Sequence, residues 1–130
     1  YDDMTDLPLS PKIYHEHTQP ANDHFYKHLR KCSSHIHAIR KFESRGRVLL
    51  LVYPPPGPMA METVRAYRDI YPEKNDVVIY VGEGKHGANA DDDFFDYFLK
   101  DGGWCVLQVL PVLPSPGNKG YEQMFVLKKI

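Results

Sequence analysis

The strongest constraint on this chain is a run of six apolar or aromatic residues, 48–53, that ends in a cluster of breakers at 54–58. A short apolar run between breakers is typical of a strand buried on both faces of a sheet. The breaker cluster contains four prolines around Gly57, and because proline has no backbone N–H, the strand must end there. In open α/β sheets, ligands bind beyond the carboxyl ends of the strands, so we expect a candidate site at this point.

Strand and helix patterns alternate through the rest of the chain. Apolar runs bounded by turn residues predict strands, and apolar stripes at three- and four-residue steps predict helices. Strands joined through helices are expected to be parallel, and the last two strands are expected to form an antiparallel hairpin. The predicted fold class is a three-layer α/β fold with a mixed, mostly parallel four-stranded sheet in β-α-β-α-β-β order. The further strands are expected at 76–81, 104–110 and 121–127, and the helices at 59–71 and 91–101.

Residues 1–46 are predicted to form an N-terminal arm followed by a helix. The arm is polar and rich in proline, and the helix is expected to begin near Asp23 and to cover the sheet. The length of 130 residues fits one ordinary domain. We therefore expect a single domain, 1–130, with its α/β core at 47–130. The apolar stripe of the N-terminal helix consists of Phe25, Leu29, Cys32, Ile36 and Ile39.

Charge and cysteine usage limit the partners and the location. The formal net charge is −1, so no long-range field favours nucleic acid or an anionic membrane. No stretch of the sequence reaches the roughly 18 apolar residues of a membrane span, and no signal peptide is visible. The two cysteines, Cys32 and Cys105, lack metal-like spacing, which favours reduced thiols in a cytoplasmic protein.

Two clusters before residue 48 leave alternatives open. Six of the seven histidines precede residue 38, and the step from His24 to His28 places both on one helix face, a spacing that suits zinc. No third ligand is fixed by spacing, so solvated histidines are the alternative and no metal is predicted. Seven lysines and arginines lie between residues 27 and 47, and they form either a solvated helix face or a surface for a phosphate-bearing or acidic partner.

The candidate ligand site lies between the loops 54–59 and 82–87, which follow two of the predicted strands. Prolines in the first loop leave backbone carbonyls unpaired, and glycines in the second let the backbone approach a ligand closely. Glu83 can bind a ribose diol, act as a base or meet a cation, and His86 can move a proton near neutral pH. The alternatives are a rigid connector for the first loop and a surface loop with a helix cap for the second. The candidate ligand-binding residues are Tyr53, Pro54, Pro55, Gly82, Glu83 and His86.

Several short motifs are similar, in their order, to a group of uncharacterised eukaryotic and microbial proteins. These motifs are LLVYPPPGPMA at 50–60, AY at 66–67, VIYVGE at 78–83 and DFF at 93–95. The apolar strand before the prolines also resembles the strand that carries the D/N-P-P-Y/F motif in amino-group methyltransferases. The similarity to the uncharacterised group covers about 48–130. The β-α-β-α-β-β order of 47–130, closing in an antiparallel hairpin, resembles the C-terminal half of the Rossmann-like S-adenosylmethionine-dependent methyltransferase fold. The resemblance implies that fold, with S-adenosylmethionine as the cofactor.

Two classes of function remain open at this point. The first is a small-molecule or nucleotide-binding α/β protein, with a degenerate methyltransferase-like enzyme as one form of it. The alternative is a non-catalytic protein-interaction or oligomerisation domain, whose sheet edge or aromatic surface meets another chain. This alternative is favoured by the absence of a glycine-rich cofactor cradle before residue 48. The sequence identifies no catalytic residue and does not decide whether the protein is an enzyme.

Overall fold

The computed structural model describes residues 28, 30–100, 103–112 and 121–130. The chain divides into two compact units, 1–38 and 39–130. Most of the helix α1 (His35–Ile39) belongs to the first unit. Ser34 Oγ accepts a hydrogen bond from His37 N at 3.1 Å, which caps the helix at its first turn. The predicted N-terminal helix is therefore shorter than expected, because residues 30–34 are not helical; residues 1–27 lie outside the described part.

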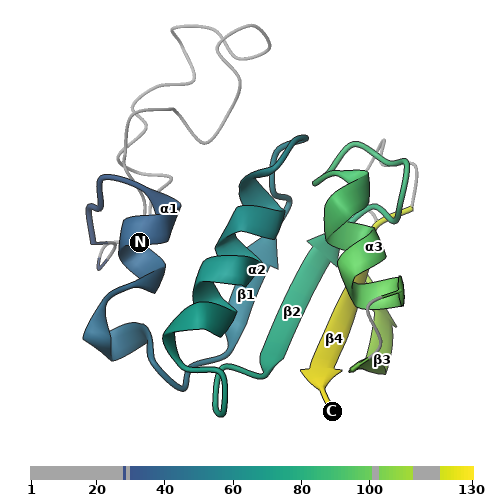
Figure 1. Cartoon of the computed structure of the whole chain (residues 1–130). Helices are drawn as coiled ribbons and strands as arrows, with labels where there is room; N and C mark the ends of the chain where they lie inside the picture. Colours follow the sequence, from purple (N-terminus) through teal and green to yellow (C-terminus); the bar gives the residue numbers. More distant parts are fainter. Residues whose placement is uncertain (1–27, 29, 101–102, 113–120) are drawn as a thin grey trace, which may run out of the picture. The chain divides into compact units, whose positions relative to one another are not determined.

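The second unit contains one sheet of four strands in the order β1-β2-β4-β3 (Figure 1). A short 3-10 helix, η3 (Phe42–Ser44), precedes the first strand. The two longer helices follow β1 and β2 in the chain. The elements are β1 (Leu49–Val52), α2 (Met59–Ile70), β2 (Val77–Gly82), α3 (Asp92–Lys100), β3 (Trp104–Pro111) and β4 (Gln123–Lys129).

The predicted fold class, a three-layer fold with a mostly parallel sheet, is wrong. β4 lies between β2 and β3 and pairs antiparallel with both. Of the three strand pairs in the described residues, β1–β2 alone is parallel. The second strand of a hairpin can pair on either side of the first strand. In this protein β4, the second strand of the β3–β4 hairpin, lies between β2 and β3. β4 thereby satisfies the backbone groups along both of its edges.

The first two strands nevertheless lie side by side in the same direction, as the sequence predicts. Leu49 pairs with Val78 and Val52 with Val81 in a parallel register. Their carboxyl ends therefore meet at one edge of the sheet.

Both long helices of this unit, α2 and α3, lie on the same face of the sheet (Figure 1). Along β1, Leu49 and Leu51 are buried, whereas Leu50 and Val52 are 58% and 52% exposed. The prediction that this strand is buried on both faces is therefore wrong. The connections β1–α2–β2 and β2–α3–β3 both run toward the β3 edge of the sheet. Because crossovers are right-handed, both helices then lie on one side of the sheet. Within this unit, the helices and the sheet form two layers.

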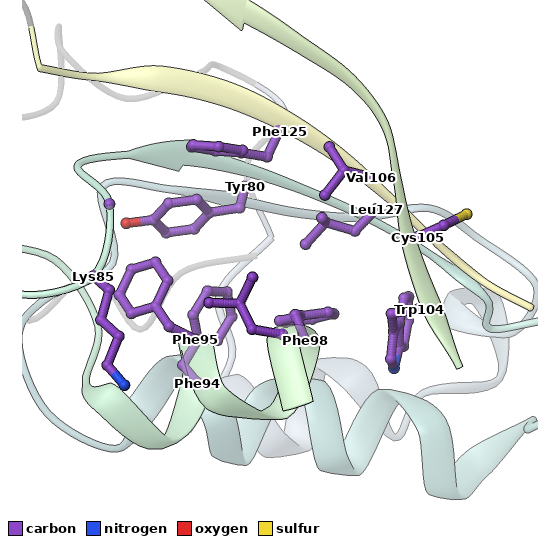
Figure 2. Close-up of a pocket in the computed structure, with 12 residues that line it drawn as sticks. Tyr80, Lys85, Phe94, Phe95, Phe98, Trp104, Cys105, Val106, Phe125 and Leu127 are labelled. Carbon is purple, nitrogen blue, oxygen red and sulfur yellow. The ribbon is translucent and has the colours of Figure 1, made fainter. Parts of the chain in front are cut away.

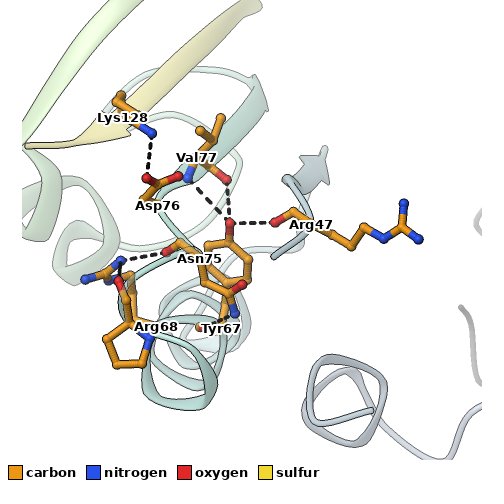
Figure 3. A network of polar contacts seen from close by, with 8 residues as sticks. Arg47, Tyr67, Arg68, Asn75, Asp76, Val77 and Lys128 are labelled. Carbon is orange, nitrogen blue, oxygen red and sulfur yellow. Dashed lines mark hydrogen bonds and ion pairs between the residues drawn. The ribbon is translucent and has the colours of Figure 1, made fainter. Parts of the chain in front are cut away.

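A polar network fixes the turn from α2 into β2 (Figure 3). The hydroxyl of Tyr67, a residue that is 2% exposed, lies 2.6 Å from Arg47 O and 3.0 Å from Val77 O. Burial, the largest cause, raises the pKa of Tyr67, so the phenol stays protonated and donates to these carbonyls. Asn75 Nδ2 donates to Tyr67 O at 2.5 Å, and Asn75 Oδ1 accepts from Gly46 N at 2.7 Å. The network ties the amino ends of β1 and β2 to the end of α2.

Candidate functional site

The carboxyl ends of β1 and β2 bring several of the predicted ligand-binding residues together. Tyr53 and Pro54 follow β1, and Gly82 ends β2. The backbone N–H of Tyr53 donates to Val81 O at 2.8 Å, which extends the pairing beyond the strand. Pro54 and Gly82 are buried, whereas Pro55 is exposed and Tyr53 is 47% exposed. The ends of β1 and β2 therefore meet as predicted, and Gly82 is buried there.

Two residues that the sequence did not single out, Asn89 and Ala90, bridge the strand ends. Asn89 Nδ2 donates to Pro54 O at 3.2 Å, and Asn89 Oδ1 accepts from Glu83 N at 3.1 Å. Ala90 N donates to Pro54 O at 3.4 Å, and Ala90 O accepts from Gly57 N at 3.2 Å. Of the backbone groups in the two loops, Pro54 O, Gly57 N and Glu83 N are therefore bonded to Asn89 or Ala90.

The side chains of Glu83 and His86 also make local contacts. The Glu83 carboxylate accepts a hydrogen bond from Ala88 N at 2.8 Å, within its own loop. His86 Nδ1 lies 3.4 Å from Asp92 Oδ1 in the first turn of α3, and its side chain is 75% exposed. The roles of Glu83 and His86 toward a ligand stay predictions.

The backbone at this edge is strained at three non-glycine residues. The φ angles of Tyr53, His86 and Ala90 are 46°, 70° and 58°. Positive φ is uncommon outside glycine and persists where surrounding contacts determine the conformation. The hydrogen bonds of Tyr53 and Ala90 supply such contacts, so the strand ends form a tightly held junction.

A cavity of about 180 Å³ lies between α3 and the strands β2, β3 and β4 (Figure 2). Three aliphatic residues and six aromatic residues form most of its wall, and a lysine, a glycine and a cysteine complete it. The Cys105 sulfur points away from the rings in Figure 2. The aliphatic residues are Leu99, Val106 and Leu127, and the aromatic residues are Tyr80, Phe94, Phe95, Phe98, Trp104 and Phe125.

The rings around the cavity hold one another in place. The Phe94 ring, in a residue that is 1% exposed, lies 5.1 Å from the centroids of both Tyr80 and Phe98. Phe98 in turn meets Trp104 at 4.8 Å in an edge-to-face arrangement. Tilted and edge-to-face pairs at these separations are favourable beyond the apolar area they bury. The wall is therefore a continuous belt of rings from β2 through α3 to β3.

The cavity opens to solvent beside β3 and the end of α3. Val106 and Leu99 line the cavity, yet they are 52% and 68% exposed. The register between β3 and β4 shifts between Val106 and Gln108, which marks a β-bulge. Because a bulge bends its strand, β3 departs from a regular course beside Val106, at the mouth of the cavity.

Polar groups are few at the cavity: Tyr80 and Lys85 are already paired, whereas the buried Trp104 Nε1 has no hydrogen-bond partner among the described residues. Tyr80 Oη donates to Glu83 O at 2.6 Å, and burial, with a smaller effect of the Glu83 charge, raises the pKa of Tyr80 to about 12. Lys85 is the one charged residue among the described residues of the lining. Its ammonium pairs with Asp96 Oδ1, and Asp96 Oδ2 accepts from Lys100 Nζ at 2.7 Å. Hydrogen bonds from Lys100 and Lys85 lower the pKa of Asp96, and the bond to Asp96 raises the pKa of Lys85.

Replacing Gly82 by alanine is expected to disturb both the strand-end junction and the cavity wall. A Cβ at Gly82 would lie 2.6 Å from Tyr80 Oη and 2.9 Å from Asn89 Oδ1, and both atoms are held by hydrogen bonds. Forcing such groups apart costs about 1–3 kcal/mol of the free energy of unfolding, which urea denaturation would measure. Gly84→Ala is the matched control, because a Cβ there meets no atom within 4 Å. Equal effects of the two substitutions would contradict the close packing at Gly82.

Metal-binding and membrane-spanning features were also sought in the described residues. Within them, no group of three His, Cys, Asp or Glu side chains is placed to hold a metal ion. His24, one of the pair with zinc-like spacing, lies outside them. The part of the chain that the structure describes contains no helix that is both long enough and apolar enough to cross a membrane. Cys32 and Cys105 are free thiols.

The many aromatic residues of the sequence indicate a well-filled core or an aromatic-lined cleft, but they do not locate the cavity beside α3. The sequence predicts Phe94, Phe95, Phe98 and Leu99 on the apolar face of the helix 91–101; the three phenylalanines pack with the core, whereas Leu99 is 68% exposed. The signal available was the number of rings on this short helix. Four aromatic side chains within nine residues are difficult to pack without leaving a gap.

Comparisons with known proteins give no support for a particular family. No family model, curated protein or solved structure matches this chain significantly. The resemblance to methyltransferases and to the group of uncharacterised proteins therefore stays a prediction from the sequence motifs.

Proposed function

We propose that this protein binds a small apolar molecule in the cavity between α3 and the sheet. The observation that carries the proposal is the open, ring-lined space of about 180 Å³. An engineered apolar cavity of roughly 150 Å³ is known to stay dry and to bind benzene. The cavity therefore suits a molecule with a single ring or a short branched chain.

The lining does not favour a nucleotide in this cavity. A ribose and its phosphates need several convergent donors and acceptors, whereas the described lining offers one lysine among mostly apolar groups. The expectation of S-adenosylmethionine comes from the resemblance alone, and the described lining of this cavity lacks the polar groups that its ribose and amino-acid parts would need. We therefore propose ligand binding without methyl transfer.

A neutral probe such as ethylbenzene is expected to raise the melting temperature in a saturable way. At ten times the dissociation constant, mass action adds roughly 1.4 kcal/mol to the stability of the folded state, which corresponds to a rise of about 5 °C for a domain of this size. Val106→Phe places a larger side chain at the mouth of the cavity, so it is expected to abolish the rise. Differential scanning calorimetry measures both effects.

Val52→Phe is the matched control for this experiment. Val52 and Val106 are both 52% exposed, but Val52 lies on the opposite face of the sheet. The control is expected to keep the full response to ethylbenzene. The proposal fails if the unsubstituted protein shows no saturable rise, or if Val106→Phe responds as strongly as Val52→Phe.

A second candidate function is self-association through the face of the sheet opposite α2 and α3 (Figure 1). Leu50 and Val52 are exposed there, and each pairs with a half-buried apolar residue, Ile79 and Val81. The occupant proposed is a second copy of the chain, since a net charge of −1 gives little repulsion between copies. Analytical ultracentrifugation over a wide concentration range tests this candidate, and a monomer at every concentration would remove it.

The proposed location is the cytoplasm. The free thiols of Cys32 and Cys105 support this proposal, because reducing compartments keep cysteines unpaired.

A further inference from the structure

We infer that the ligand of the α3 cavity carries a carboxylate, so that the favoured class is a small aryl or branched-alkyl carboxylic acid. The inference rests on the proposed function, because it adds a charged group to a molecule whose apolar part fills the cavity. It starts from Lys85, the charged residue among the described residues of an otherwise mostly apolar lining.

Lys85 lines one end of the cavity with its stem, while its ammonium pairs with Asp96 on α3 and must turn from it to meet a ligand. It follows β2 by three residues and runs along one end of the ring-lined space, beside α3 (Figure 2). Its side chain is 26% exposed, because its aliphatic stem lies against the lining. An ion pair with an exposed ammonium is a small but favourable contribution. A carboxylate attached to a ring in the cavity would therefore gain from meeting Lys85.

Asp96, the present partner of Lys85, does not need Lys85 to balance its charge. Asp96 Oδ1 pairs with Lys85, while Asp96 Oδ2 is held by Lys100 Nζ at 2.7 Å. When Lys85 turns to a ligand, Asp96 keeps Lys100 and remains a paired carboxylate. The cost of exchanging the partner of Lys85 is thus lower than for an isolated ion pair, in which the abandoned charge is left alone.

The arrangement also excludes the opposite charge. A cationic ligand would meet the ammonium of Lys85, while Asp96 is already occupied by two lysines. An uncharged ligand of the same shape would leave the Lys85–Asp96 pair intact and gain nothing from it. The site therefore distinguishes an acid from its neutral analogue, which gives the inference a direct test.

The test compares 3-phenylpropionate with 3-phenylpropionamide, which has the same shape without the charge. Trp104 lines the cavity and is the single tryptophan of the chain, so its fluorescence reports binding of either probe. The acid is expected to bind about fivefold more tightly than the amide at neutral pH, the upper end of the range for an exposed ion pair. In Lys85→Met the ratio is expected to fall to one or below, since Asp96 then faces the ligand without Lys85.

Two further variants separate the role of Lys85 from a general effect of charge. Lys85→Arg is expected to keep the preference for the acid. Lys100→Met leaves Asp96 with Lys85 alone, so turning Lys85 to a ligand then abandons the carboxylate, and the preference for the acid is expected to fall but not to vanish. The readout is the ratio of the dissociation constants of the amide and the acid within each variant. A change in overall affinity therefore cancels.

The outcomes distinguish this inference from the proposed function. If ethylbenzene binds and Val106→Phe blocks it, but the acid has no advantage over the amide, the carboxylate inference is overturned and the proposed function stands. The carboxylate inference is also overturned if the preference for the acid survives in Lys85→Met or disappears equally in Lys100→Met. If none of the three probes binds, the proposed function itself fails.

Discussion

Replacing Phe94 by alanine is expected to lower the free energy of unfolding by about 3–5 kcal/mol, the range for removing a buried aromatic ring. Phe94 is 1% exposed, and its ring contacts Tyr80, Phe95 and Phe98 at centroid separations of 5.1, 5.2 and 5.1 Å. The ring links α3 to β2 and also forms part of the cavity wall. Its loss would enlarge a space that is already unfilled, so the neighbours have little means to close the gap.

Leu99→Ala on the same helix is the control for this prediction. Leu99 also lines the cavity but is 68% exposed, and substitutions at exposed positions usually change stability by no more than about 0.5 kcal/mol. Urea denaturation followed by Trp104 fluorescence measures both variants. A loss below about 1 kcal/mol for Phe94→Ala would mean that this ring does not anchor α3 to the sheet.

The second large effect is expected at the turn between α2 and β2, where Asn75→Ala should cost about 2–4 kcal/mol. Asn75 is 1% exposed, and its side chain bonds Tyr67 O at 2.5 Å and Gly46 N at 2.7 Å. Removing the amide leaves both backbone groups without their partner, and each such loss in a shielded place costs about 1–3 kcal/mol. The cavity that replaces the side chain adds to the cost.

Glu73→Ala is the control in the same turn, because Glu73 is exposed. Its effect is expected to stay within about 0.5 kcal/mol of zero. Amide hydrogen exchange gives a second readout for Asn75→Ala, since protection should fall at Gly46 while the centre of β2 remains protected. If Asn75→Ala and Glu73→Ala proved equally stable, the network of Figure 3 would not contribute to folding.

Local elements were predictable here because each has a local cause. The strand at 48–53 ends at prolines, and β1 (Leu49–Val52) ends just before them. The helix expected at 59–71 is α2 (Met59–Ile70), whose apolar stripe faces the sheet. Apolar runs, breakers and periodicity act within a few residues, so one sequence suffices to locate them.

The arrangement of the sheet was not predictable in the same way. Whether β4 pairs outside β3 or between β2 and β3 depends on contacts between residues far apart in the chain, such as Tyr80 with Phe125. The apolar run in β1 was interpreted as a strand buried on both faces, although Leu50 and Val52 are exposed. Hydrophobicity alone does not show which face of a strand a helix will cover.

In the candidate site, too, the local features were predictable and the contacts between distant residues were not. Strand ends placed Pro54 and Glu83 at one edge, as the parallel pairing of β1 and β2 requires. That Asn89 bridges them could not be predicted from the loop sequence, because a glycine-rich loop has many conformations. The cavity was hidden for a different reason: a gap between rings depends on how side chains from α3, β2, β3 and β4 fit together.

The most direct test of this account is an NMR titration of the isotope-labelled protein with ethylbenzene. The account predicts saturable shifts in the side chains of Phe94, Val106 and Leu127, which surround the cavity, and little change at Tyr53 and Glu83. Saturable shifts at Tyr53 and Glu83 without shifts at the cavity would place the ligand at the strand ends instead. An absence of saturable shifts anywhere would contradict the claim that the space under α3 receives a ligand.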